Sequence, residues 1–221
     1  MEAHTRLGFI VALVMAIAIA AIASADTKSR KLSLKEMLEI NSLAANGGFE
    51  MGKGMRAERW QGAATHPPVR TKAEAHSGKY SMHSKLVNEG KVPQEGLLEQ
   101  SFEIPEVPEE NAEPLMFSFW IKVVHSGPSY VQQYHITWMD KNGRNLGSTG
   151  FKHYGGKPGE WTQVTAKLSP PAKTVQSHVR FRFVTGAVKG GSGEAYIDDI
   201  VLMTRDPKGL KRLTDQLQRN R

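Results

Sequence analysis

The sequence contains no cysteine among its 221 residues. This absence excludes disulfides, thiolate nucleophiles and zinc-thiolate sites, so a metal that cross-links the fold has to be a hard cation. Several enzyme signatures are missing as well: the His-Glu-x-x-His zinc motif, the Gly-x-Ser-x-Gly nucleophile elbow, the phosphate-binding loop and the dinucleotide fingerprint. The adjacent carboxylates of Glu109 and Glu110 lie in an acidic, proline-punctuated segment that we expect to be a solvated loop. We therefore expect no catalysis.

Positive charge exceeds negative charge, with a formal net charge of +7 at pH 7. Much of the excess lies near the two ends, between Lys28 and Lys31 and between Lys208 and Arg221. Such a balance suits acidic partners, including anionic polysaccharides, envelope surfaces and nucleic acid. The stretch between the two ends is less one-sided, and we expect no nucleic-acid partner.

One long apolar run is present, over residues 7–22, and Ala23-Ser24-Ala25 follows it. A run of this length before a small-x-small site is typical of a secretory signal peptide cleaved after Ala25. An uncleaved membrane anchor is the alternative, since the run approaches the length of a membrane span. Either interpretation predicts export, to a secreted or extracytoplasmic location, and membrane contact only if the segment is retained.

Short segments of alternating polarity, separated by Gly, Pro and Asn, follow from Asn46 onward. In the segment 115–124, Phe117, Phe119, Ile121 and Val123 share one face, which a two-residue period places inward. Similar alternation predicts strands at 130–139, 161–168, 178–184 and 196–203, with a turn at 140–143. The pattern predicts an all-β fold, a β-sandwich.

The domain organisation follows from these boundaries. We expect a signal peptide or anchor at residues 1–25, a lead-in segment at 26–45, one sandwich domain at 46–204 and a basic tail or short helix at 205–221. No repeat of the sandwich pattern and no low-complexity linker is present, so a single domain is predicted.

The ordered motifs resemble a known family. They are Asn46-Gly47-Gly48-Phe49-Glu50, Trp60, His76-Ser77-Gly78-Lys79-Tyr80-Ser81, Phe117-Ser118-Phe119-Trp120-Ile121-Lys122, Trp138-Met139-Asp140-Lys141-Asn142-Gly143, Gly159-Glu160-Trp161-Thr162 and Tyr196-Ile197-Asp198-Asp199-Ile200. This series resembles carbohydrate-binding modules of the family-four and family-nine type, within the galactose-binding-like jelly-roll superfamily. The resemblance covers about residues 46–202 and implies a jelly-roll sandwich.

The resemblance also implies a structural calcium ion near the chain ends of the sandwich. The matching positions are Gly48, Glu50, Ser77, Lys79 and Asp198. Calcium binds six to eight oxygens, which carboxylates and backbone carbonyls supply. The alternative is that Asp198 and Asp199 end an edge strand in solvent and that Glu50 pairs with a neighbouring lysine.

A sugar needs an aromatic plane for its apolar face and polar groups for its hydroxyls. Residues opposite the predicted core faces offer this mixture, together with an aromatic side chain in the loop after the first motif. The predicted ligand-binding residues are Trp60, Trp120, Gln133, His135, Arg180 and Arg182. The alternatives are that Arg180 and Arg182 form an ordinary solvated face and that a loop covers Trp120.

The sequence thus predicts a secreted, monomeric and non-catalytic module that binds a polysaccharide or oligosaccharide on a concave sheet. The alternative is a structural or adhesive envelope protein that uses the same sandwich for protein contacts.

Overall fold

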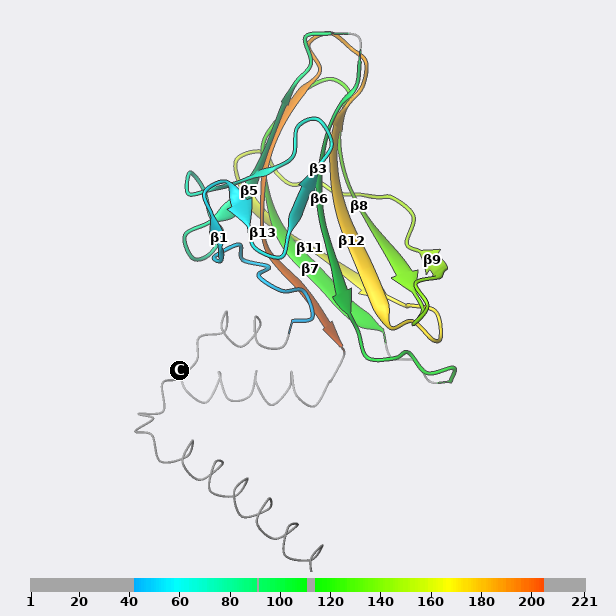
Figure 1. Cartoon of the computed structure of the whole chain (residues 1–221). Helices are drawn as coiled ribbons and strands as arrows, with labels where there is room; N and C mark the ends of the chain where they lie inside the picture. The colour runs from blue at the N-terminus through cyan, green and yellow to red at the C-terminus, as the bar shows by residue number, and fades with distance from the viewer. Residues whose placement is uncertain (1–41, 91, 111–113, 205–221) are drawn as a thin grey trace, which may run out of the picture. The chain divides into compact units, whose positions relative to one another are not determined.

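The computed structural model describes residues 42–90, 92–110 and 114–204, and every regular element in these ranges is a β-strand (Figure 1). The predicted signal segment and basic tail, and most of the predicted lead-in segment, lie outside the described residues. No helix that is long and apolar enough to cross a membrane occurs in the described ranges. The strands are β1 (Gly52–Lys53), β2 (Arg56–Ala57), β3 (Gln61–Ala63), β4 (Val69–Thr71), β5 (Ser81–Val87), β6 (Gln94–Glu103), β7 (Leu115–Ser126), β8 (Tyr130–Met139), β9 (Asn145–Ser148), β10 (Lys152–His153), β11 (Trp161–Leu168), β12 (Gln176–Thr185) and β13 (Ser192–Thr204).

Two antiparallel sheets form the body of the domain. The six-stranded sheet has the order β10-β8-β12-β6-β3, with β9 also paired to β8, and the five-stranded sheet has the order β11-β7-β13-β5-β4. Figure 1 shows β12 and β8 in one layer and β7 and β11 in the layer behind it. The short pair β1 and β2 stands apart from both sheets. The predicted all-β sandwich is confirmed.

The core lies between the two sheets and is built from the alternating residues of their long strands. Phe117 and Phe119 of β7 face Phe181 of β12, with ring centroids 6.1 Å and 5.0 Å apart. All three rings are buried, as is Phe183. Burying large aromatic and aliphatic side chains is the main favourable contribution to folding, so this layer of phenylalanines holds the two sheets together.

Register shifts interrupt the pairing of β13 with β7 at two places, between Glu194 and Ala195 and between Asp198 and Val201. A β-bulge separates Asp198 from Val201, and Asp199 has a φ of 47°. Asp198 pairs with Trp120 on the outer side of the sheet, whereas Leu202 pairs with the buried Phe117. A bulge inserts an extra residue and so changes which side chains face inward. The bulge therefore puts Asp198 and Leu202 on opposite sides of the sheet.

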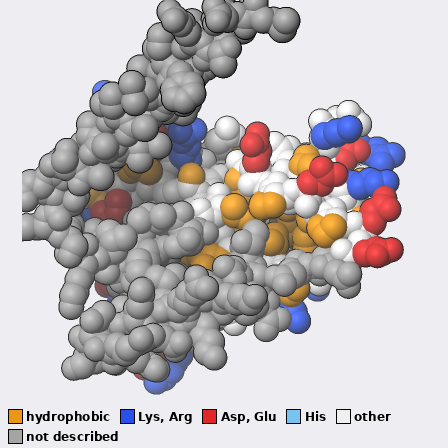
Figure 2. Space-filling model, turned by 90° about the horizontal axis from the view of Figure 1, so that it is seen from below, with side chains coloured by type: hydrophobic (Ala, Val, Ile, Leu, Met, Phe, Trp, Pro, Cys, Tyr) orange, Lys and Arg blue, Asp and Glu red, His pale blue; other side chains and the backbone are white. Residues whose placement is uncertain are grey.

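Figure 2 shows the domain from below, at one end of the strands. Hydrophobic side chains gather in the middle of the described surface, and Lys, Arg, Asp and Glu side chains lie together at its right-hand rim.

Candidate functional site

The predicted ligand-binding residues lie on two different faces of the sandwich. Gln133 and His135 of β8 pair with Arg182 and Arg180 of β12 on the outer side of the six-stranded sheet, where they alternate with buried core residues. Trp120 lies on the outer side of the other sheet. The structure thus brings four of the six predicted residues together and separates Trp120 from them.

A continuous set of polar contacts crosses this outer side, which we call the polar face. Arg182 Nη1 donates to Gln133 Oε1 at 3.1 Å, and its Nε donates to Glu95. Arg180 Nε donates to Glu99 in the same way. The polar face comprises Glu95, Glu99, Gln133, His135, Phe151, His153, His178, Arg180 and Arg182.

Phe151 supplies an aromatic ring to the polar face. Its ring stacks on His135, with centroids 4.9 Å apart, and the Arg182 guanidinium carbon lies 5.7 Å from its centroid. About half of the side chain is exposed, at 49%. Phe151 is not among the predicted ligand-binding residues, because it lies between β9 and β10 and its approach to β8 is a tertiary contact. The only feature of the sequence that could have pointed to Phe151 as a binding residue is an aromatic residue beside a glycine turn.

The polar face combines balanced charges with neutral imidazoles. Glu99 and Glu95 pair with Arg180 and Arg182. Burial lowers the pKa of His135, and the neighbouring Arg180 and His178 lower it further. Burial also lowers the pKa of His178, against the opposing effect of Glu99. Both imidazoles are therefore neutral at neutral pH, and each can donate one hydrogen bond and accept another.

Trp120 is covered by the segment before β5. The His76 imidazole stacks on its indole with centroids 3.8 Å apart, and Trp161 contacts the same imidazole edge-on at 5.6 Å. Beside it, Lys122 Nζ pairs with Glu74 Oε1 at 2.9 Å. The indole is half-buried, and the imidazole covers one of its faces.

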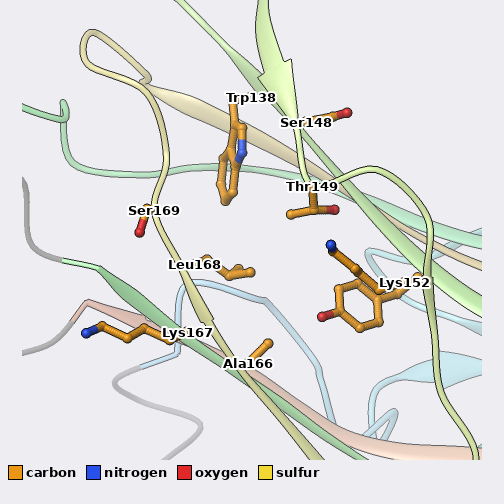
Figure 3. A pocket seen from close by; sticks show the side chains of 9 residues that line it. Trp138, Ser148, Thr149, Lys152, Ala166, Lys167, Leu168 and Ser169 are labelled. Carbon is orange, nitrogen blue, oxygen red and sulfur yellow. The ribbon is translucent and has the colours of Figure 1, made fainter.

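A cavity of about 450 Å³ lies between the open edges of the two sheets (Figure 3). Trp138 of β8 and Leu168 of β11 form its apolar side, and Thr149 and Lys152 contribute polar groups. The cavity is separate from the polar face, because the side chains that line it from β8 point between the sheets.

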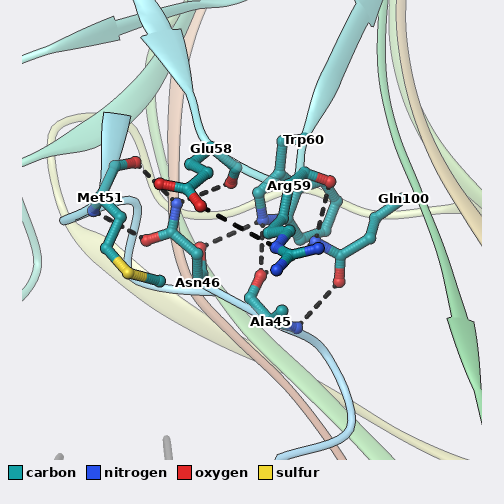
Figure 4. A network of polar contacts seen from close by, with 7 residues as sticks. All are labelled: Ala45, Asn46, Met51, Glu58, Arg59, Trp60 and Gln100. Carbon is teal, nitrogen blue, oxygen red and sulfur yellow. Dashed lines mark hydrogen bonds and ion pairs between the residues drawn. The ribbon is translucent and has the colours of Figure 1, made fainter. Parts of the chain in front are cut away.

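Trp60 is a core residue. Its ring packs between Phe49 and Phe181, with centroids 5.6 Å and 6.2 Å away, and only 6% of the residue is exposed. Its Nε1 donates to the carbonyls of Ala45 and Asn46, both at 3.1 Å (Figure 4). The ring therefore has no free face, and we remove Trp60 from the candidate ligand-binding residues.

The positions predicted for calcium meet at one turn. Glu50 Oε1 accepts hydrogen bonds from the backbone amides of Lys79, at 2.8 Å, and Tyr80, at 3.3 Å. Asp198 Oδ2 accepts from the amides of His76, at 2.8 Å, and Ser77, at 3.2 Å. The structure thus brings the first motif, the turn at 76–80 and the last strand together, and Gly48 lies buried in the first motif.

The electrostatics of this cluster fit a cation. Asp198 is fully buried, and burial together with the adjacent Asp199 raises the pKa of its carboxyl to about 8. The backbone amides of Ser77, Asp199 and His76 that donate to this carboxyl partly oppose the rise, and a bound cation would oppose it as well. Within the described ranges no group of three His, Asp or Glu side chains forms a metal cluster. Backbone carbonyls of the turn would therefore have to complete the coordination.

Comparison with known proteins identifies the fold. No family model and no curated protein sequence matches this chain. Among solved structures, TmCBM61, solved in complex with β-1,4-galactotriose, matches with a TM-score of 0.50 and 19% identity, over 74% of this chain and 99% of TmCBM61. The chain has the β-sandwich fold of carbohydrate-binding modules. The family-four or family-nine type within this fold stays a prediction.

Two enzyme structures contain the same fold as a part. The enzymatically active domain of tailspike protein 4 from bacteriophage CBA120 matches with a TM-score of 0.56 and 12% identity, and arabinose-bound MgGH51 α-L-arabinofuranosidase with 0.51 and 16%. The matches cover 75% and 74% of this chain but only 22% and 26% of those chains. This chain thus spans about a quarter of each enzyme chain.

Proposed function

We propose that this protein is a non-catalytic carbohydrate-binding protein and that it binds a polysaccharide or oligosaccharide on the polar face. The observation that carries the proposal is the half-exposed ring of Phe151, which contacts His135 and lies near Arg182. Sugar recognition requires such a ring for the apolar face of a pyranose and nearby donors and acceptors for its hydroxyls. The fold supports the same proposal, because TmCBM61 shares it along nearly its whole length.

The arrangement of the guanidinium groups adds to this support. Arg182 is fixed on two sides, by Glu95 and by Gln133. A side chain that is already held in place loses little conformational entropy on binding. Because the two carboxylates balance the two arginines, the polar face presents hydrogen-bonding groups without a strong net charge.

Affinity electrophoresis on a panel of neutral and acidic glycans tests the proposal. We expect retardation by at least one glycan, and about a tenfold loss of affinity in Phe151→Ala, because one stacking contact contributes on the order of 1 kcal/mol. Met55→Ala is the matched control, since Met55 is also an exposed apolar side chain, at 68%, but lies between β1 and β2. A folded protein that no glycan retards would refute the proposal, as would equal effects of the two substitutions.

We also propose that a structural calcium ion binds at Glu50, Asp198 and the turn at 76–80. The fit rests on the raised pKa of the buried Asp198 carboxyl and on the two carboxylates that share one turn. Since a ligand that binds only the folded state stabilises it, chelation should lower the melting temperature and added calcium should restore it. An unchanged melting curve in chelator would remove the ion from the proposal.

Export is a separate part of the proposal and rests on residues 7–25 of the sequence. We propose cleavage after Ala25 and release of the mature protein outside the cytoplasm, with membrane contact only if cleavage fails. N-terminal sequencing of the protein from its native source tests this directly, and an N-terminus at Asp26 is expected. Recovery of the intact segment in the membrane fraction would support the anchor instead.

A further inference from the structure

The cavity between the sheet edges combines an apolar side with one inward-facing lysine. Lys152 pairs with the buried Tyr134 across the ladder from β10 to β8, so its side chain points between the sheets. Its chain neighbours Phe151 and His153 lie on the polar face instead. Figure 3 shows the Lys152 ammonium group turned into the cavity near Thr149, and the Lys167 side chain turned away from it.

Among the described residues, no acidic side chain lines this cavity. Its apolar side comes from Trp138 and Leu168, which are 3% and 5% exposed. Among the described residues Lys152 has no ion pair, whereas other exposed lysines such as Lys157 and Lys173 do. Lys152 is itself exposed, so its ammonium group would attract an anion through a direct charge-assisted hydrogen bond at the cavity. The cavity therefore favours a ligand with one negative charge.

The size and polarity of the cavity indicate the rest of such a ligand. At about 450 Å³ the cavity falls within the range of small-molecule sites, roughly 300 to 1,000 Å³. Ser148, Thr149 and Ser169 place hydroxyl groups around it. Trp138 and Leu168 are too buried to offer an open stacking plane, so the hydroxyl groups and Lys152 would supply most of the contacts to a ligand.

We propose that this cavity binds a sugar unit that carries a carboxylate, with Lys152 as the counter-charge. The site goes beyond the proposed function and does not depend on it, since none of the residues of the cavity belongs to the polar face. An ammonium–carboxylate hydrogen bond is roughly twice as strong as one between neutral groups. A sugar with a carboxylate should therefore bind beside Lys152 more tightly than the same sugar without one.

Titration of the full chain with D-galacturonate, D-galactose and acetate tests the inference, by isothermal calorimetry and by ¹H–¹⁵N NMR. Galacturonate and galactose share the ring and differ at the carboxylate, and acetate carries the charge without the ring. We expect galacturonate to bind at least tenfold more tightly than either, and its chemical-shift changes to fall on residues 148–152 and 166–169. Equal binding of galactose or acetate would overturn the proposal, as would shifts confined to other residues.

Substitutions at two lysines distinguish the effect of a charge inside the cavity from the effect of the protein's overall charge. Lys152→Met should weaken galacturonate binding about tenfold or more, while Lys152→Arg keeps most of it. Lys167→Met removes the same charge at the rim, with a side chain that points away, and should have little effect. Equal losses in the two methionine variants, or none in Lys152→Met, would refute the site. The polysaccharide retardation attributed to Phe151 should be unchanged in both, so the two proposals can fail separately.

Discussion

The imidazole ring of His76 lies parallel to the indole ring of Trp120, with 3.8 Å between their centroids and 13° between their planes. The same imidazole places Nδ1 at 2.7 Å from Asp199 Oδ2. One side chain thus joins the turn before β5 to β7 and to the bulge of β13. Trp120, which the sequence predicted to bind the sugar, is part of the packing that holds this turn in place.

We expect His76→Ala to expose Trp120 and to lower the free energy of unfolding by about 1 to 2 kcal/mol, through loss of the stacked pair and of the Asp199 contact. Acrylamide quenching of tryptophan fluorescence reports the exposure of Trp120 together with Trp161, which contacts the same imidazole, since Trp60 and Trp138 stay buried. Urea titration reports the stability. His66→Ala, at an exposed position, is the control. Quenching that does not increase in His76→Ala would contradict the covering role of His76.

The strands with regular alternation could be predicted from the sequence. The predicted segments 130–139 and 161–168 coincide with β8 and β11, and Gly143, with a φ of 74°, forms the predicted turn after β8. In these strands most inward positions are apolar, with Gln132 and Thr162 as exceptions, so the two-residue period is visible without any tertiary information.

Other features depend on tertiary contacts that a linear pattern does not contain. The strand β6 was not predicted, because its inward positions include Gly96 and Gln100. Gln100 is buried only because it exchanges hydrogen bonds with the backbone of Ala45, 2.9 Å in each direction. Phe151 reaches the polar face through a turn, and Trp60 enters the core from a loop, so neither position follows from alternation.

Gly193 is expected to tolerate no side chain. A Cβ atom there would lie 2.1 to 2.3 Å from atoms of the Tyr130 ring, which rests on this residue between the two sheets. Gly193→Ala should therefore lower the free energy of unfolding by about 1 to 3 kcal/mol, the usual range for overpacking. Chemical denaturation measures the change. Gly155→Ala is the control, because nothing lies within 4 Å of the added atom, and a loss as large in this variant would contradict the steric cause.

Arg70 joins the first motif to β4 and should not be replaceable by lysine. Its Nε donates to the Phe49 carbonyl at 2.6 Å and its Nη2 to the Glu50 carbonyl at 2.7 Å, and the residue is buried. Lysine lacks the rigid fork that reaches both carbonyls. We expect both Arg70→Lys and Arg70→Met to lower the free energy of unfolding, Met by about 3 kcal/mol and Lys by at least half as much. Full stability of Arg70→Lys in thermal denaturation would show that charge alone suffices.

Asp198 should make stability depend on pH when calcium is absent. Its carboxyl has a pKa of about 8 in the folded protein, raised by burial and by Asp199, against 3.8 for an unperturbed group. The folded state therefore holds a proton that the unfolded state has lost, so the free energy of unfolding falls as pH rises from about 4 to about 8. The slope contributed by one such group is at most about 1.4 kcal/mol per pH unit. Urea titrations in chelator measure this slope.

Asp198→Asn should remove the slope, since asparagine resembles the protonated carboxyl. Bound calcium should reduce the slope by stabilising the carboxylate. A pH dependence that is identical in Asp198→Asn and in the parent protein would contradict the assignment.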